Sequence, residues 1–578
     1  MKQEDHEDLF APWDMFFETL QKQNKTMAQS FFEEMQHHFP VPPTFVGDVF
    51  LKAGQALLQN PSQIIKAQEE LLGDIHDLWQ KTLSSQNEQA LDHGADKRFR
   101  HPAWQEIPYF LFMKEYYLMM TRWLQKCVAE ADGLDPQTNQ KVQFYTKQLV
   151  EAFSPTNFPF SNPEVLEQAI KTKGASLQKG LEALLEDLES GQWMKMTDPS
   201  AFELGKTIAA TKGDVVFRND LFELIRYAPR TEKQYAVPLL IIPSWINKYY
   251  VFDLSAPNSF VLWLLEQGYN VFIVSWVNPG PEHGSKTFED YLTHGAYRAA
   301  EVISSLTRSK TLHAVGYCLG GNMVAALGAY LAKVPAPFSL QTITLLATII
   351  DFTKVDDLKA FVDEDYIQHI EKTMEKKGFL EADILKSFFS LLRPGDMVWS
   401  FFIKNYLLGQ IPPAFDFLHW NADSTRLPAT LHTFILRKWF QGNFFMKPGL
   451  GGFEVKDISF DLRDITTPAY VLGTLEDHIA PWNSCYPATH LFNGPVRFVL
   501  AGSGHVAGVM NPPARNKYAF FENDRFPESP QAWFESATKT DGSWWPAWQK
   551  WLALHAAEKI IPQQSYPSLE EAPGSYVR

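Results

Sequence analysis

The chain has 578 residues, of which 45% are hydrophobic, so it is long enough for two or more domains with substantial cores. Its formal net charge of −15 argues against binding to nucleic acid, which relies on Lys and Arg side chains that neutralise phosphates. The cysteines Cys127, Cys318 and Cys485 include no C-x-x-C pair, which indicates neither a zinc site nor a disulfide framework and favours a reducing compartment.

The N-terminal part of the sequence is polar and helical in pattern. Its first residues, MKQEDHEDLFAPW, lack the basic region and apolar run of a secretory signal. No stretch has the roughly 18 uncharged apolar residues that a transmembrane segment needs, so we expect a cytoplasmic protein. Residues 1–200 repeat apolar positions at helical spacing, which predicts a helical N-terminal domain. The aromatic-rich stretch 98–124 packs either on the chain's own catalytic domain or on a partner, a second copy or an apolar surface.

Residues 201–578 predict an α/β catalytic domain, because short apolar runs alternate with helical ones. The runs that predict buried strands are 237–245, 269–277, 312–316, 340–348, 468–473 and 496–500, with an amphipathic helix at 288–308. Strands that alternate with helices predict right-handed crossovers and a mainly parallel sheet. Aromatic helical sequence interrupts this pattern at about 352–440. It predicts a helical cap inserted above the carboxyl ends of the strands, where such sheets have their active sites.

The stretch HAVGYCLGGN (313–322) follows the third predicted strand and precedes a helix rich in small residues. It has the G-x-S-x-G pattern of a nucleophile elbow, with Cys318 in place of the serine. The pattern alone leaves two interpretations open: a turn that presents a thiol for acyl transfer, or a glycine-rich turn with a small buried cysteine. Cys127 and Cys485 lack such a context, and we expect both to be buried packing residues.

Two further residues favour the catalytic interpretation. Asp477 comes directly after the strand 468–473, and His505 lies in a loop after the next strand. The chain order Cys318, Asp477, His505 is the order of the catalytic triad in α/β-hydrolases, so we predict that fold and this triad. His478 is a rival base. As the immediate neighbour of Asp477, it is poorly placed to donate the orienting hydrogen bond to that carboxylate while its other ring nitrogen reaches the thiol.

An oxyanion hole should accompany the triad. One donor should be the backbone N–H of Leu319, the residue after the nucleophile, and the other should come from the loop 243–254. We take Val251 as the second donor, although the sequence narrows it only to residues 245–251. We expect no metal and no cofactor in this chemistry.

Motifs along the chain resemble those of polyhydroxyalkanoate synthases. They are PSWINKYYVFDL (243–254), VSWVNP (274–279), GYCLGG (316–321), LRPGDMVW (392–399), HWNADSTRLP (419–428), EDHIAPW (476–482) and GSGHVAGVMNPP (502–513). DKRFRHPAWQE (96–106) and FSPTNFPFSNPE (153–164) extend the likeness, which covers roughly residues 95–545. The single long chain with its helical N-terminal region resembles the class I members.

The resemblance implies an enzyme that joins (R)-3-hydroxyacyl groups from coenzyme A (CoA) thioesters into a polyester and releases CoA. Class I members favour short groups such as 3-hydroxybutyryl. The nucleophile, acid and histidine of the family fall on Cys318, Asp477 and His505. The resemblance also implies a homodimer at the surface of polyester granules, with the growing polyester chain as a partner and the N-terminal region helping activity and granule association.

Cysteine suits this reaction, because a thiolate that attacks a thioester exchanges one thioester for another at little change in free energy. The acyl group stays activated until a 3-hydroxyl takes it as an oxygen ester. Asp477 either orients His505 or helps to deprotonate that hydroxyl, and both roles stay open.

Two other classes of function are compatible with these residues. One is a hydrolase with the same triad, in which water is the acceptor: a thioesterase, a dienelactone-hydrolase-like enzyme or a polyester depolymerase. The other is a non-catalytic granule-coat protein.

An apolar cap would keep water from the stored thioester. The aromatic residues that we expect above Cys318 are Phe389, Trp399, Phe401, Phe402, Phe415, Phe417 and Trp420, although they could equally pack the cap's own core. Arg393 and Lys248 are weak candidates for contacts to the phosphates of CoA, since such charges are more often solvated.

Overall fold

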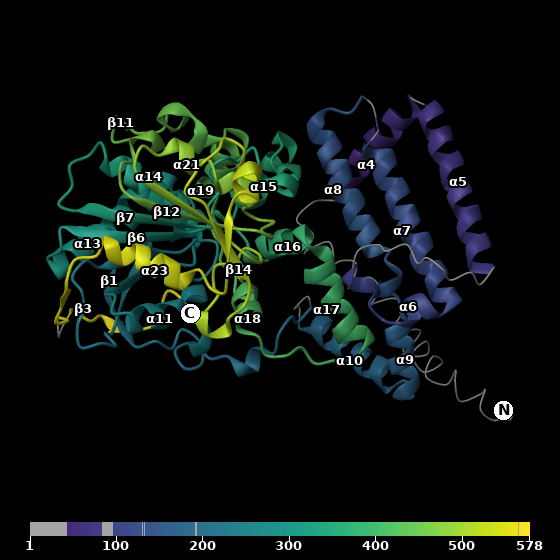
Figure 1. Ribbon diagram of the computed structural model, residues 1–578, viewed down its shortest axis with the longest axis horizontal. Coiled ribbons are helices and arrows are strands. Elements are labelled where there is room, and N and C mark those ends of the chain that lie inside the picture. Colours follow the sequence, from purple (N-terminus) through teal and green to yellow (C-terminus); the bar gives the residue numbers. More distant parts are fainter. Residues whose placement is uncertain are drawn as a thin grey trace. The chain divides into compact units, whose positions relative to one another are not determined.

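A computed structural model describes residues 43–59, 61–83, 96–129, 131, 133–190, 194–563 and 566–578 (Figure 1). The acidic first residues of the sequence lie outside this set. The chain divides into two compact units: a helical unit, Met1–Asp198 with Ser387–Pro413, and a sheet unit, Pro199–Lys386 with Ala414–Arg578. Across the part of the chain that the structure describes, no helix is both long and apolar enough to cross a membrane.

The helical unit is built mainly from helices of the first 190 residues. They are α4 (Pro43–Leu58), α5 (Pro61–Leu83), α6 (Ala103–Glu106), α7 (Pro108–Ala129), α8 (Pro136–Ala152), α9 (Pro163–Lys171) and α10 (Ala175–Glu189). Asp135 and Asn162 cap α8 and α9, each with a proline at the start of the helix. The aromatic stretch 98–124 packs within this unit, because its buried side chains form a cluster with Val150 of α8.

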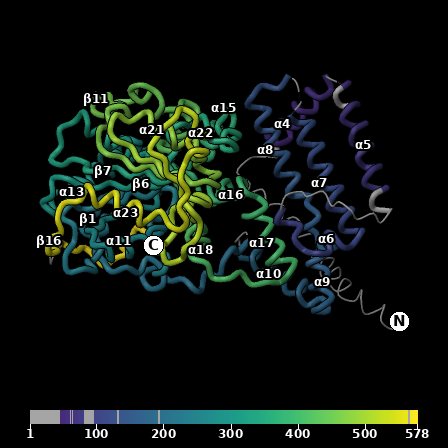
Figure 2. The backbone as a smooth tube through the Cα atoms, viewed as in Figure 1, coloured from purple at the N-terminus to yellow at the C-terminus, as the bar shows by residue number. Residues whose placement is uncertain are grey.

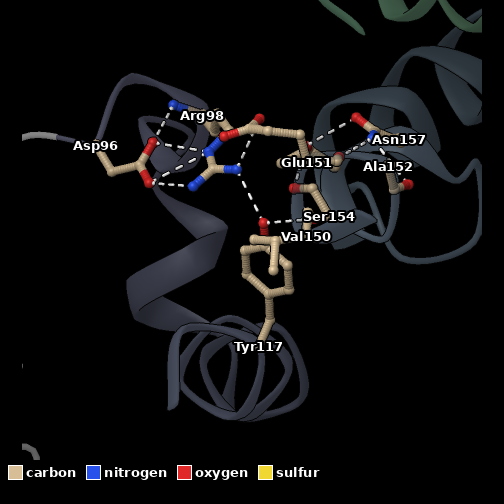
Figure 3. Close-up of polar contacts among 9 residues, drawn as sticks. Asp96, Arg98, Tyr117, Val150, Glu151, Ala152, Ser154 and Asn157 are labelled. Carbon is tan, nitrogen blue, oxygen red and sulfur yellow. Dashed lines mark hydrogen bonds and ion pairs between the residues drawn. The ribbon is translucent and has the colours of Figure 1, made fainter. Parts of the chain in front are cut away.

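Two sequence motifs of the helical unit meet in one polar cluster (Figure 3). The guanidinium of Arg98 donates to Asp96 at 2.8 Å, to Glu151 at 3.1 Å and to the hydroxyl of Tyr117 at 2.9 Å. The side-chain amide of Asn157 donates to the carbonyl of Glu151 at 2.7 Å. Burial by itself lowers the pKa of Arg98, but the neighbouring acidic groups raise it well above its usual range. This cluster therefore joins the 96–106 motif to the 153–164 motif.

The segment Ser387–Pro413, in the middle of the predicted cap, folds with the helical unit. It holds the end of α16 (Ala382–Leu392), the π-helical turns η9 (Gly395–Trp399) and η10 (Ile403–Leu407), and α17 (Ser400–Phe402). The hydroxyl of Tyr406 donates to Asp187 at 2.8 Å, and a Cβ on Gly180 would lie 2.0 Å from the Tyr406 carbonyl oxygen. Figure 2 shows this green segment beside the blue α10. The predicted cap is thus divided between the two units.

The sheet unit holds a sheet that has 11 strands among the described residues, in the order β15-β14-β13-β12-β7-β6-β4-β5-β2-β1-β17. Its central strands, from β13 to β5, run parallel. They are β4 (Leu239–Ile242), β5 (Val271–Trp276), β6 (Thr311–Tyr317), β7 (Ser339–Leu346), β12 (Ala469–Thr474) and β13 (Val496–Ala501). Each overlaps one of the predicted runs, so the prediction of a mainly parallel sheet is confirmed.

The outer strands of the sheet are antiparallel. They were not predicted from the sequence, because they do not form continuous apolar runs. They are β1 (Gly213–Arg218), β2 (Phe222–Tyr227), β14 (Ala519–Glu522), β15 (Thr538–Asp541) and β17 (Glu570–Glu571). Strand β2 is buried along its whole length although it contains Glu223 and Arg226. The Glu223 carboxylate accepts hydrogen bonds from Arg218 and from the Ser575 backbone, which satisfies its charge.

Helices connect the strands of the sheet unit. The predicted helix 288–308 is α12 (Phe288–Asp290), the π-helical η7 (Tyr291–Tyr297) and α13 (Arg298–Thr307) in succession. The others are α11 (Phe260–Glu266), α14 (Leu319–Leu331), α15 (Glu364–Glu375), α18 (Asp416–Ala422), α19 (Ala429–Phe434), α20 (Trp482–Cys485), α21 (Ala488–Leu491), α22 (Pro530–Glu535) and α23 (Trp545–Leu554). Helix α14 follows β6 directly, so the residue between them, Cys318, stands at the carboxyl edge of the parallel strands.

Candidate active site

Cys318 occupies a strained turn between β6 and α14. Its backbone has φ 53° and ψ −123°, a conformation that costs a residue with a side chain about 1–3 kcal/mol. The Cys318 backbone N–H donates to the Leu346 carbonyl at 2.9 Å, so strand β7 supports the turn. A strained strand-to-helix turn with the side chain at its tip is the geometry that the elbow motif predicts.

The glycines on both sides of Cys318 let the backbone segments approach closely. A Cβ on Gly320 would lie 2.1 Å from the carbonyl oxygen of Ile242, at the end of β4. A Cβ on Gly316 would lie 2.4 Å from the carbonyl oxygen of Gly320. Because both contacts involve backbone atoms, larger residues at these positions would push α14 away from the sheet.

Asp477 lies at the end of β12 with both carboxylate oxygens engaged. Its Oδ1 accepts the backbone N–H groups of Ile479 at 2.9 Å and Ala480 at 2.8 Å, and its Oδ2 accepts the Thr474 hydroxyl at 2.6 Å. Burial alone raises the pKa of this carboxyl, but these bonds and His505 hold the pKa below its ordinary value. Thr474 was not predicted from the sequence. The one feature that could have indicated it is its position three residues before Asp477.

His505 joins Asp477 to Cys318. Its Nδ1 lies 2.7 Å from Asp477 Oδ2, and Nδ1 is the donor because an ionised carboxylate only accepts. Burial lowers the pKa of His505, but Asp477 and Cys318, by charge and by hydrogen bonding, raise it to about 10. The ring of Tyr317 lies 5.1 Å from the imidazole ring. The structure therefore brings the three predicted residues together, with Asp477 bonded to His505.

The three side chains are buried together at the edge of the sheet. The exposed fractions are 9% for Cys318, 7% for Asp477 and 6% for His505. Cys485 is also buried, and burial raises the pKa of its thiol well above the usual range. Cys127 is only partly buried, so the expectation that it is a buried residue was wrong.

The two predicted oxyanion donors lie in different environments. Leu319 is the first residue of α14, where a backbone N–H has no partner within its own helix. Val251 lies in the 3-10 turn η4 (Tyr249–Phe252) and belongs to the same buried hydrophobic cluster as Cys318. Their role as donors stays a prediction.

The predicted cap residues separate into two groups. Phe417 and Trp420 belong to the buried cluster that contains Cys318, and Phe415 contacts Phe417. The others, Phe389, Trp399, Phe401 and Phe402, lie on the segment that folds with the helical unit.

The two candidate phosphate ligands are engaged within the protein. Arg393 pairs with Asp396 in the helical unit. Lys248 Nζ lies 2.9 Å from Asp423 Oδ1 and donates to the Val577 carbonyl at 2.7 Å. The side chain of Lys248 is only 10% exposed, so its ammonium group is committed to these partners.

Comparison with known proteins identifies the family. The model described as "Poly-beta-hydroxybutyrate polymerase (PhaC) N-terminus" matches residues 95–264, and the alpha/beta hydrolase fold matches residues 237–512. The chain is 41% identical over 540 residues to a poly(3-hydroxyalkanoate) polymerase of Methylorubrum extorquens, with 91% of this chain and 89% of the relative covered. It is 39% identical to the poly(3-hydroxyalkanoate) polymerase subunit PhaC of Rhizobium meliloti (94% and 90% covered) and to that of Cupriavidus necator (90% and 89% covered).

These matches confirm the predicted α/β-hydrolase fold and the resemblance drawn from the motifs. They also confirm that the protein is an enzyme. The chain belongs to the poly(3-hydroxyalkanoate) polymerase family.

Proposed function

We propose that the protein polymerises (R)-3-hydroxyacyl groups, 3-hydroxybutyryl in particular, from CoA thioesters into a polyester and releases CoA. The observation that carries this proposal is the buried Cys318–His505–Asp477 arrangement at a strained elbow, in a chain of the polymerase family. In this reaction Cys318 is the nucleophile, His505 carries the proton and Asp477 is the acid of the triad.

In the first step, His505 takes the proton of the Cys318 thiol, and the thiolate attacks the carbonyl carbon of the substrate thioester. The negative oxygen of the tetrahedral intermediate receives hydrogen bonds from the backbone N–H groups of Leu319 and Val251. The bond to the CoA sulfur then breaks, and CoA leaves as a thiol with the proton from His505. The acyl group is now a thioester of Cys318.

In the second step, the 3-hydroxyl of another hydroxyacyl group attacks the thioester of Cys318. His505 takes the hydroxyl proton and returns it to the Cys318 sulfur as the oxygen ester forms. Asp477 bonds to the Nδ1 side of His505, which supports the orienting role over direct deprotonation of the hydroxyl. Each cycle lengthens the chain by one unit and consumes one CoA thioester.

Water is the competing acceptor, and its use would make the enzyme a thioesterase. The low exposure of Cys318 and the apolar side chains of Phe417 and Trp420 in its cluster support the hydroxyl over water.

We also propose that the protein is a cytoplasmic homodimer that associates with polyester granules through the helical unit. Large apolar side chains on that unit are exposed and would suit a polyester surface: Ile107, Tyr109, Phe153, Phe158 and Phe160. The growing polyester chain itself would then remain close to the enzyme that extends it.

The test is the fate of (R)-3-hydroxybutyryl-CoA. We expect release of CoA with polyester as the main product and free 3-hydroxybutyrate as a minor one. Cys318→Ala should abolish CoA release, whereas Cys127→Ala, at a partly buried cysteine outside the site, should not. One free acid for each CoA, with no polymer, would identify a thioesterase and contradict the proposal.

A further inference from the structure

The loop 243–254, which contains Val251, begins in contact with the elbow. The carbonyl carbon of Pro243 would lie 2.7 Å from a Cβ on Gly320, so the loop leaves β4 against α14. Further along, the loop contributes apolar residues to the buried cluster that contains Cys318: Tyr249, Tyr250, Val251, Phe252 and Leu254. A backbone donor in this loop can serve the reaction only if the loop keeps one conformation.

The segment 416–426, which includes most of the HWNADSTRLP motif, holds this loop at successive positions. The contacts to the loop backbone are Trp420 Nε1 to the Lys248 carbonyl at 2.8 Å, Thr425 Oγ1 to the Trp245 carbonyl at 2.9 Å, and an antiparallel bridge between Asn247 and Ser424. Just beyond the C-terminal end of the loop, Ser255 and Asn258 donate to the Asp416 carboxylate. Two segments more than 150 residues apart in sequence are thus joined along their length.

Asp423 adds the charged contacts of this junction. Its Oδ2 accepts the hydroxyl of Tyr250 at 2.8 Å, and its Oδ1 lies 2.9 Å from Lys248 Nζ. Lys248 also donates to the Val577 carbonyl at 2.7 Å, which ties a third segment to the loop. Because Lys248 is largely buried, loss of Asp423 would leave its ammonium group without its carboxylate partner. Both contacts of Asp423 lie within three residues of Val251.

We propose that Asp423 is a positioning residue for acyl transfer. Its carboxylate fixes Lys248 and Tyr250, and the fixed loop holds the Val251 N–H toward the oxyanion that forms when Cys318 attacks. The inference rests on the proposed function, because it requires a tetrahedral intermediate at Cys318. A donor displaced by about 1 Å can lower a rate by about 100-fold, so a small movement of the loop is enough.

The experiment measures acylation of Cys318 by rapid quench after full-length protein is mixed with (R)-3-hydroxybutyryl-CoA. Asp423→Ala should slow acylation by about 10- to 100-fold, with much less change in KM. Tyr250→Phe should cause a smaller decrease, because the Lys248–Asp423 pair remains. The matched control is Glu381→Ala, which removes an exposed ion pair with Lys377 elsewhere in the chain and should leave the rate unchanged.

Thermal unfolding of each variant separates positioning from folding. If Asp423→Ala lowers the Tm, the double variant Lys248→Met/Asp423→Ala should restore the Tm, because no unpaired charge remains, but not the acylation rate. Recovery of both would contradict the positioning role. A wild-type rate in Asp423→Ala would overturn the inference, whereas failure of the unmodified protein to acylate Cys318 would instead overturn the proposed function.

Discussion

Replacement of Gly320 by alanine tests whether the elbow depends on close contact between α14 and β4. The added Cβ would lie 2.1 Å from the Ile242 carbonyl oxygen and 2.7 Å from the carbonyl carbon and oxygen of Pro243. These are backbone atoms that cannot rotate away, so α14 must move by about 1 Å to reach ordinary contact distance. Such overpacking lowers the free energy of unfolding by about 1–3 kcal/mol. A displacement of this size at the nucleophile also lowers the rate by about 100-fold.

Chemical denaturation and the initial rate of CoA release measure both effects of Gly320→Ala. The matched control is Gly73→Ala in α5, where no atom other than those of the neighbouring residues and backbone of α5 lies within 4 Å of the added Cβ. That change removes a glycine from a helix interior and should raise the free energy of unfolding by about 0.5–1 kcal/mol without affecting the rate. Wild-type stability and rate in Gly320→Ala would refute the argument that close packing shapes the elbow.

Two other substitutions test the ion pairs. Asp477→Asn removes a carboxylate that raises the pKa of His505 above its unfolded value of about 6.5. The His505–Asp477 pair therefore stabilises the fold fully below about pH 6.5, and this stabilisation is lost as the pH rises through about 10. In scanning fluorimetry, the difference in Tm between wild type and Asp477→Asn should therefore shrink as the pH rises from 6.5 to 10. A difference that stays constant over this range would contradict the predicted role of the His505–Asp477 pair. Arg98→Ala should lower the free energy of unfolding by about 1–3 kcal/mol, because it removes bonds to Asp96 and Glu151, and no loss would contradict that.

The central strands, and the meeting of Cys318, Asp477 and His505 at one edge of the sheet, could be predicted from sequence for the same physical reason; their catalytic role stays a prediction. A parallel strand buried on both faces needs a continuous apolar run, and its carboxyl end is where a catalytic side chain is placed. Cys318, Asp477 and His505 each follow such a run, and the structure brings them together. The outer strand β2 could not be predicted in this way, because the charged residues Glu223 and Arg226 interrupt its apolar run. Both are buried with partners elsewhere in the chain.

The division of the cap could not be predicted from local pattern. Apolar spacing shows that a helix has a buried side, but it does not show which part of the protein covers that side. Phe402, for example, packs against Val165 and Leu177 of the helical unit rather than among the residues around Cys318. Local pattern likewise could not show that Lys248 is paired, because its carboxylate partner, Asp423, is 175 residues away in sequence.

Mass spectrometry of the acyl-enzyme shows directly whether Cys318 carries the acyl group during the reaction. The protein is mixed with (R)-3-hydroxybutyryl-CoA, quenched within one turnover and digested, and the peptides that carry Cys318, Cys127 and Cys485 are compared. If Cys318 is the nucleophile, 3-hydroxybutyryl units will be found on the Cys318 peptide alone, attached through a bond that hydroxylamine cleaves as a thioester. Release of CoA without acyl groups on that peptide, or with acyl groups on another residue, would show that Cys318 is not the nucleophile.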